Sequence, residues 1–193
     1  EFYYPELLPH LSSCKSPQQM FGAIMKTYYA EKFGIDPAKM VVVSVMPCIA
    51  KKAEKLRDDQ AASGYPDIDI AITTRELARL IKSYGLDFDK LPNEAFDNPI
   101  GEGSTAGLIF GATGGVMEAA LRTVAEVVTG KTLEKVDFKA VRGVEGIKTA
   151  TVDLGEKKVK VCVASGLANA KKVLEEIKSG KADYQFVEIM SCP

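Results

Sequence analysis

Short apolar runs alternate with amphipathic stretches along most of the chain. The runs at 40–46, 67–72 and 184–190 are rich in β-branched and aromatic residues, which is typical of strands. Residues 136–163 include alternating apolar and polar side chains and a turn near Leu154-Gly155-Glu156, and this pattern predicts a β-hairpin. The order of the elements predicts an α/β fold: a layered α/β/α domain with a mostly parallel, mixed sheet of about four strands plus the hairpin, flanked by helices.

The stretches between these runs repeat apolar residues at the spacing of a helix. For the first helix, Ser16 is the predicted N-cap, Pro17 occupies the first helical position and Gln19 closes a capping box. A second capping box is predicted for Thr73 and Glu76. The predicted helices cover roughly residues 17–33, 49–60, 74–84, 116–128 and 167–179.

Composition and charge argue against two classes of partner. A formal net charge of −1 over 193 residues provides no basic surface that would favour nucleic acid or anionic lipid. Apolar runs stay shorter than the ~20 residues that a membrane helix needs, so no membrane is expected. The chain opens neither with methionine nor with a signal peptide, and we expect a cytoplasmic protein whose first residue here lies inside a longer sequence.

Two of the four cysteines follow predicted strands. Cys48 comes after the run 40–46 and Cys192 after the run 184–190, each two residues beyond a methionine. Functional groups of α/β sheets gather at the carboxyl ends of parallel strands, so we expect both thiols at one rim, as ligands of a metal-type site. Cys48 is expected in the first turn of a helix, one turn before Lys51, where a thiolate and an ammonium can receive an anionic or metal-bound group. The alternative is that both cysteines are buried as small hydrophobic residues.

The remaining cysteines and the single histidine are expected to be structural or incidental. Cys162 lies inside an alternating strand pattern, which predicts a packing role. Cys14 and His10 lie in loop-like sequence, where neither is given a role. The chain contains no C-x-x-C pair, which excludes a zinc ribbon and a thioredoxin motif.

A glycine-rich segment at 101–115, GEGSTAGLIFGATGG, precedes the predicted helix at 116–128, with Thr113 as the predicted N-cap. The segment lacks the Gly-Lys-Ser/Thr of a P-loop and the G-x-G-x-x-G of a Rossmann fold. Its glycines allow close backbone approach either to a ligand or to another helix, and the residues leave both possibilities open.

Several motifs occur in order over nearly the whole chain: YYPELL, LSSxKSPQQ, VMPCxxKKxE, DIDIAITTRELA, IFGATGGVMEAALR, VRG and EIMSC. In this order they resemble the catalytic domain of [FeFe]-hydrogenases. The resemblance implies an enzyme that interconverts protons, electrons and dihydrogen at the H-cluster, a [4Fe-4S] cube that shares a cysteine with a diiron centre carrying CO, cyanide and a dithiolate bridge. It also implies an electron carrier such as ferredoxin and the hydrogenase maturation machinery as partners.

The resemblance implies roles for individual residues. Cys48 and Cys192 match ligands of the cube, and Lys51 matches the lysine that donates to a cyanide of the diiron centre. Ser12 matches a hydroxyl of the proton relay. The residues that match the lining of the diiron pocket are Met46, Met190, Pro17, Gln18 and Phe110.

Two cysteine motifs of the family are incomplete in this sequence. The TSCCP-type motif expected before residue 1 is absent, and so is the second cysteine of the closing C-x-x-x-C motif. Two thiolates do not hold a cube that requires four. We therefore expect residues 1–193 to be part of the H-cluster domain, truncated before the first and within the last cysteine motif, without cluster and inactive as an isolated fragment.

Two alternatives to a hydrogenase remain. One is a hydrogenase-like iron–sulfur protein that serves assembly or interaction without a diiron centre, and the other is a hydrogen sensor with the same cofactor. Residues that match a cyanide donor and a proton relay favour a diiron centre, because a plain cube needs neither. They do not separate catalysis from sensing.

Overall fold

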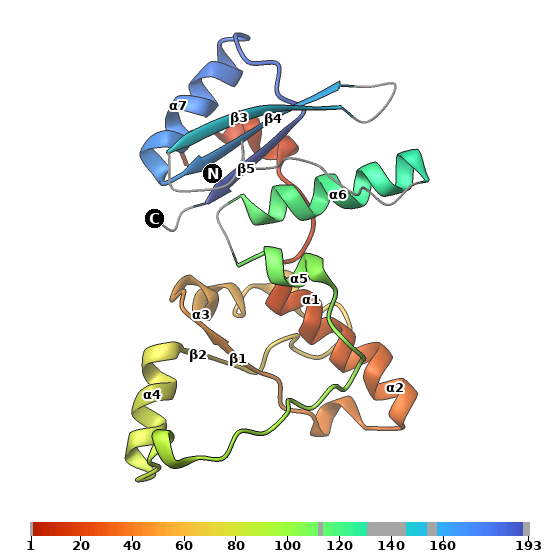
Figure 1. Ribbon diagram of the computed structural model, residues 1–193, viewed down its shortest axis with the longest axis vertical. Helices are drawn as coiled ribbons and strands as arrows, with labels where there is room; N and C mark the ends of the chain where they lie inside the picture. The colour runs from red at the N-terminus through yellow and green to blue at the C-terminus, as the bar shows by residue number, and fades with distance from the viewer. Residues whose placement is uncertain (1, 112–113, 131–145, 154–157, 191–193) are drawn as a thin grey trace. The chain divides into compact units, whose positions relative to one another are not determined.

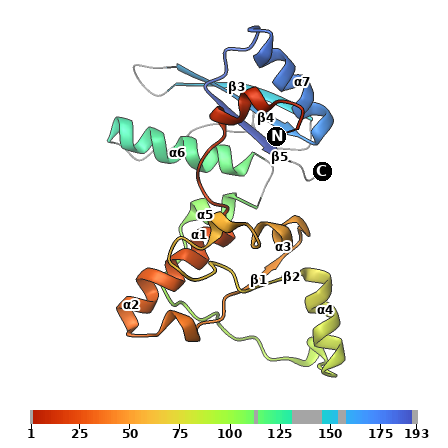
Figure 2. The ribbon, with the colours of Figure 1, turned by 180° about the vertical axis from the view of Figure 1, so that it is seen from behind.

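The computed structural model describes residues 2–111, 114–130, 146–153 and 158–190 (Figures 1 and 2). They belong to two compact units: an N-terminal unit of residues 6–101, and a C-terminal unit of residues 1–5 and 102–193. A short 3₁₀ helix, η1 (Pro5–His10), begins at the last residue of the segment 1–5.

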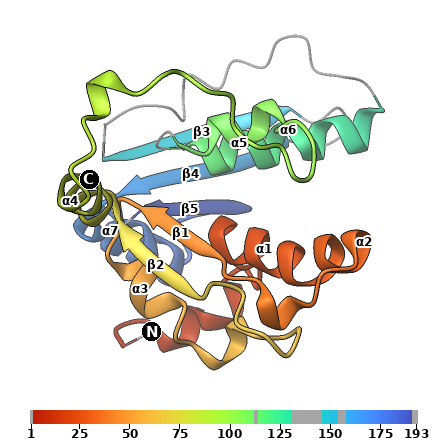
Figure 3. The same ribbon diagram turned by 90° about the horizontal axis from the view of Figure 1, so that it is seen from below.

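The N-terminal unit is built around a parallel pair of strands, β1 (Val43–Met46) and β2 (Ile70–Thr73) (Figure 3). Each strand is followed by a helix, α3 (Ala50–Glu54) after β1 and α4 (Thr74–Ser83) after β2. The carboxyl ends of both strands therefore lie at the same edge, where α3 and α4 begin. The unit's other helical segments are α1 (Pro17–Ile24), the π-helix η2 (Met25–Tyr29), α2 (Ala30–Phe33), η3 (Pro37–Lys39), η4 (Asp58–Gln60) and η5 (Phe88–Lys90).

One of the two predicted capping boxes is confirmed. Thr73 and Glu76 exchange both bonds of the box at the start of α4. The box predicted for Ser16 and Gln19 is wrong: the Ser16 side chain makes no capping bond, and its hydroxyl donates to Glu54 instead. The Ser16 hydroxyl bonds to Glu54, which is distant in the sequence, in place of the nearby backbone N–H of α1. A sequence pattern within one helix does not reveal such a partner.

The helix predicted for residues 49–60 is much shorter in the structure. It is limited to α3, with Ile49 as its N-cap, so Cys48 lies just before the helix and not in its first turn. Ile49 and Leu56 are 74% and 73% exposed. The segment thus lacks a buried apolar stripe to anchor a longer helix.

The C-terminal unit contains a three-stranded sheet in the order β3-β4-β5. Strands β3 (Ile147–Asp153) and β4 (Lys158–Ser165) are antiparallel and confirm the predicted hairpin, while β5 (Phe186–Met190) pairs with β4 in parallel. The predicted turn at Leu154-Gly155-Glu156 and the segment 136–145 lie outside the described residues. The unit's helices are α5 (Thr105–Ile109), α6 (Gly115–Thr129) and α7 (Leu167–Lys178).

Successive residues of β4 pack on opposite faces of this sheet. Val161 and Val163 contact Met117 of α6, whereas Cys162 packs with Val173 of α7. Figure 1 shows α6 and α7 on opposite sides of the strands. The unit is therefore a helix–sheet–helix sandwich, as a side-chain period of two requires when both faces are covered.

The prediction that Cys162 is a packing residue is confirmed. Its side chain is fully buried in the cluster that faces α7. Burial, together with the nearby Glu176, raises the pKa of the Cys162 thiol to about 11. A thiol in this state is neutral and unreactive at physiological pH.

The predicted α/β class, with parallel pairing, a hairpin and flanking helices, is confirmed. The described strands belong to two sheets, since β1 pairs with β2 and the other three strands pair among themselves. Within the described ranges, no helix combines the length and apolar character needed to cross a membrane.

Candidate functional site

Cys48 follows the carboxyl end of β1. It is separated from Met46, the last residue of the strand, by Pro47 alone. The thiol is free and partly exposed, in contrast to the buried Cys162. Cys48 is therefore available as a ligand at the edge where sheets of this class place their sites.

Lys51 lies three residues after Cys48 and is held by a carboxylate. Its Nζ donates to Oε2 of Glu54 at 2.5 Å, and the two side chains are only 26% and 23% exposed. An ammonium group has three N–H donors, so this bond leaves donor capacity for an anionic acceptor. Lys51 is thus a partly desolvated cation that Glu54 holds in place.

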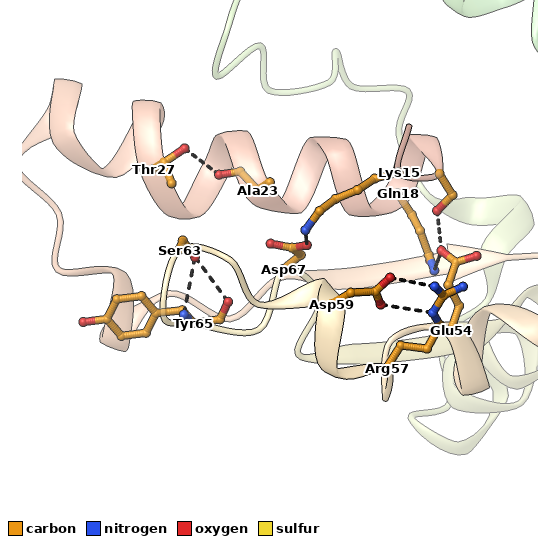
Figure 4. A network of polar contacts seen from close by, with 11 residues as sticks. Lys15, Gln18, Ala23, Thr27, Glu54, Arg57, Asp59, Ser63, Tyr65 and Asp67 are labelled. Carbon is orange, nitrogen blue, oxygen red and sulfur yellow. Dashed lines mark hydrogen bonds and ion pairs between the residues drawn. The ribbon is translucent and has the colours of Figure 1, made fainter. Parts of the chain in front are cut away.

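Gln18 and Ser16 bind the other oxygen of Glu54, Oε1. The Ser16 hydroxyl donates to it, and Gln18 Nε2 donates to it at 3.1 Å (Figure 4). Gln18 is 4% exposed, and the Ser44 hydroxyl of β1 donates to its Oε1 at 2.6 Å. Glu54 thus connects the start of α1 with α3, and Gln18 extends the connection to β1.

The environment of Glu54 keeps it ionised. Burial raises the pKa of the carboxyl, but hydrogen bonds from Lys51, Ser16 and Gln18 outweigh burial, so the pKa lies below its usual value. Donors to the charged form of a carboxylate have this effect. Glu54 is accordingly a fixed negative charge at neutral pH.

Ser12 and Glu54 line the same open pocket of the N-terminal unit. Ser12 is exposed and its Oγ accepts from the Cys14 N–H at 3.2 Å, while Pro17 is exposed at the first position of α1. The residues around the pocket are mostly polar or charged: Ser12, Ser13, Cys14, Lys15, Ser16, Glu54, Arg57, Asp59 and Gln60. A hydroxyl and a carboxylate in one open polar pocket are groups suited to contact water.

The other predicted site residues belong to the C-terminal unit. Phe110 is the C-cap of α5 and 38% exposed, and Met190 ends β5, where its carbonyl accepts from the Gly166 N–H at 2.8 Å. Thr113 and Cys192 lie outside the described residues. The convergence of Cys192 with Cys48 therefore stays a prediction.

A buried carboxylate in the C-terminal unit, Glu188, holds the start of α6. Its Oε2 accepts from the Met117 N–H at 2.7 Å, and within the described part of the chain its Oε1 has no partner. Burial raises the pKa of Glu188, and bonds from the backbone N–H groups of Met117 and Gly114 only partly counteract it. Glu188 thus fixes the end of the glycine-rich segment that follows Phe110.

Sequence reasoning assigned no role to Glu54, Ser44 or Glu188. The signals were present but weak: Glu54 is three residues after Lys51, and Ser44 is the one hydroxyl in an otherwise apolar strand. A buried acid within the apolar run of β5 is a similar signal. Only the tertiary contacts show what each of these side chains binds.

The donors fit part of an iron–sulfur site. Among the described residues, no three or more His, Cys, Asp or Glu side chains gather as metal ligands. Cys48 nevertheless has the chemistry of a cluster ligand, because its thiol is free and partly exposed, and the Lys51 ammonium three residues later can donate to an anionic metal-bound group. The fit concerns Cys48 and Lys51 and not a complete set of ligands.

Comparisons with known proteins agree with this chemistry. The periplasmic [Fe] hydrogenase large subunit of Nitratidesulfovibrio vulgaris is 55% identical over 193 residues, 100% of this chain and 46% of that protein. A solved [FeFe]-hydrogenase structure that concerns stepwise H-cluster assembly has a TM-score of 0.80 at 42% identity, over 99% of this chain and 55% of that one. Protein NAR1 of Arabidopsis thaliana is 34% identical over 202 residues, 97% of this chain and 42% of that protein.

The chain thus spans about half the length of these relatives. Over its full length, residues 1–193, it matches the family described as iron only hydrogenase large subunit, C-terminal domain. The match extends across both compact units and includes the segment that carries Cys48 and Lys51. The chain belongs to the iron-only hydrogenase large-subunit family.

Proposed function

We propose that the protein is part of an [FeFe]-hydrogenase that catalyses the reversible reaction of two protons and two electrons to dihydrogen at an H-cluster. The observation that carries this proposal is that Glu54 holds the Lys51 ammonium at 2.5 Å, three residues after the free Cys48. A cation fixed beside a cluster ligand suits an anionic metal-bound group such as cyanide. The family membership supports the same conclusion.

In this proposal each residue has a limited task. When bound, the cluster supplies the redox chemistry and makes or breaks the bond of dihydrogen. Cys48 and Cys192 are two of its cysteine ligands, and Lys51 donates a charge-assisted hydrogen bond to a cyanide. Ser12 passes a proton through its hydroxyl. The side chains that keep water from the diiron centre are those of Met46, Met190, Pro17, Gln18 and Phe110.

An assembly or interaction protein without a diiron centre is the second candidate. The similarity to Protein NAR1 of Arabidopsis thaliana favours keeping it in view. The hydrogenase proposal has the stronger support, because identity to the hydrogenase subunit is 55% and identity to the NAR1 protein is 34%. A hydrogen sensor would use the same residues, and measured turnover separates it from an enzyme.

The experiment that tests the function is Lys51→Ala in the full-length protein. We expect dihydrogen turnover to be lost while the iron of the cube stays bound, because Lys51 serves the diiron centre and not the cube. Iron content and hydrogen evolution are measured on the same samples. Wild-type turnover in Lys51→Ala would remove the proposed role of this lysine.

We propose an acidic electron carrier such as ferredoxin as a partner, with the hydrogenase maturation machinery as a second. A pocket lined by Pro47 and Ile49, the residues on either side of Cys48 in the chain, also contains the cations Lys52, Arg75 and Arg79 and the acid Glu76. Cations beside a cluster ligand provide electrostatic complementarity for an acidic protein. In Arg79→Glu, the ratio of ferredoxin-driven to dye-driven turnover should fall severalfold, and an unchanged ratio would exclude this surface.

The expectation that residues 1–193 alone hold no cluster also stays a proposal. Anaerobic reconstitution of this chain with iron and sulfide should yield only adventitious iron. A stoichiometric, EPR-active cube would contradict it. The cytoplasmic location is likewise proposed, and cell fractionation of the full-length protein tests it.

A further inference from the structure

We propose that Glu54 is a positioning residue, which holds the Lys51 ammonium in the orientation that the anionic ligand of the cluster requires. This inference rests on the proposed role of Lys51. It assigns a task to a side chain that does not itself touch the cofactor.

The first argument is that the two oxygens of Glu54 bind different groups. Oε2 accepts only the short bond from Lys51, whereas Oε1 accepts from both Ser16 and Gln18. The Oε1 bonds fix the rotation of the carboxylate, and Oε2 then fixes the ammonium. A lysine side chain has four rotatable bonds, so this anchor removes much of its conformational freedom before any ligand binds.

The second argument is that Gln18, which holds Glu54, is itself held by Ser44 of β1. The Ser44 hydroxyl occupies Oε1 of Gln18, which leaves Nε2 to face Glu54. Ser44 is 7% exposed and Gln18 is 4% exposed. The chain Ser44–Gln18–Glu54–Lys51 therefore transmits the position of β1 to the ammonium, and Cys48 follows the same strand.

The third argument excludes a different role, that of a proton carrier. A carboxyl that carries protons near neutral pH needs a pKa close to that pH. The three donors around Glu54 instead keep it ionised. A permanent negative charge suits the anchoring of an ammonium.

The neighbouring lysine, Lys52, is anchored by a different element. Lys52 forms an ion pair with Glu76, whose side chain also closes the capping box of α4. These two side chains are 36% and 39% exposed, compared with 26% and 23% for Lys51 and Glu54. Adjacent lysines on one short helix are thus held by different elements, and only Lys51 is joined to α1 and, through Gln18, to β1.

The test is Glu54→Gln in the full-length holoprotein, read by infrared spectroscopy of the cyanide stretching bands. Glutamine keeps the size and the bonding to Ser16 but removes the charge that holds Lys51. We expect the cyanide bands of Glu54→Gln to shift in the same direction as those of Lys51→Met. We also expect turnover to fall roughly tenfold, which corresponds to about 1.4 kcal/mol. Iron content should stay at the wild-type value, and Glu94→Gln, which removes an exposed carboxylate of the same unit outside the pocket that Glu54 lines, is the matched control.

A double variant separates positioning from a structural effect. If Glu54 acts through Lys51, adding Glu54→Gln to Lys51→Met causes no further band shift. Wild-type bands in Glu54→Gln, together with shifted bands in Lys51→Met, would overturn this inference alone. Wild-type bands in Lys51→Met would overturn the proposed role of Lys51 and the inference with it. Loss of iron in Glu54→Gln, with additive band shifts in the double variant, would assign Glu54 a structural role and also overturn the inference.

Discussion

The two compact units bury different kinds of side chain. In the C-terminal unit the buried residues are mainly apolar and form two clusters, one on each face of the sheet. In the N-terminal unit the buried apolar residues described are Ala30, Ile68 and Ala71. Its buried polar residues are Gln18, Gln19, Lys26, Ser44, Gln60 and Asp67.

The difference shows how one chain combines two sources of stability. Apolar clusters stabilise the fold in proportion to the apolar area that they remove from water, and a cavity within them lowers stability. Buried polar groups gain little net free energy, but an unpaired partner is costly, so they fix orientation more than they add stability. The N-terminal unit, which carries Cys48 and Lys51, has the polar interior that orients side chains.

The largest change in stability is expected in the C-terminal unit, whose buried residues are mainly apolar. Met117 of α6 is fully buried against β4. Met117→Ala should lower the free energy of unfolding by about 3 kcal/mol, because apolar burial is lost and a cavity is left. Urea unfolding measures the loss, and hydrogen exchange should increase in β4 but not in β1. Val127→Ala on the same helix, at a position 78% exposed, should change stability by less than about 0.5 kcal/mol. Equal effects of the two substitutions would contradict the assignment of this core.

A smaller loss of stability is expected in the N-terminal unit, whose buried residues are mainly polar. Lys26 is 3% exposed; its Nζ lies 2.9 Å from Asp69 and donates to the carbonyl of Met40. Lys26→Met should cost about 2 kcal/mol, less than for a fully buried pair, because Asp69 is 25% exposed. Lys39→Met, at an exposed position, is the control, and equilibrium unfolding compares the two. If Lys26→Met were as stable as its control, the polar interior would contribute nothing to the fold.

The smallest effect is the opposite response of two carboxyls to pH, the buried Glu188 and the partly buried Glu54. The pKa of Glu188 is raised, so its stabilising contribution is present below the ordinary value of 4.5 and is lost as pH rises through the folded pKa. The pKa of Glu54 is lowered, so its contribution is present above 4.5 and is lost as pH falls through the folded pKa.

Thermal unfolding from pH 4 to 8 should therefore separate two variants. Relative to the wild type, Glu188→Gln should gain stability as pH rises above 4.5, because glutamine avoids burying a charge. Glu54→Gln should be less stable than the wild type by a constant amount above pH 4.5, because its ammonium partner is left unpaired, and this deficit should shrink as pH falls below 4.5. Parallel pH profiles for both variants would refute the opposite assignments.

Local signals predicted the elements whose formation depends on adjacent residues. The capping box of Thr73 and Glu76, the hairpin of β3 and β4 and the packing role of Cys162 are all confirmed. The signals failed where a distant group competed with a local one, as when the Ser16 hydroxyl turned to Glu54. The motifs identified the family, which the full-length match confirms.

The sequence by itself determined the alternation of strands and helices and the family to which the chain belongs, because periodicity and motif are properties of neighbours along the chain. Only the tertiary structure decided which groups hold Gln18 and Oε1 of Glu54. Their partners come from α1, α3 and β1, separated by 26 and 36 residues for the Gln18 bonds to Ser44 and Glu54. Hydrogen bonds over such separations depend on how the elements pack, and no local pattern specifies them.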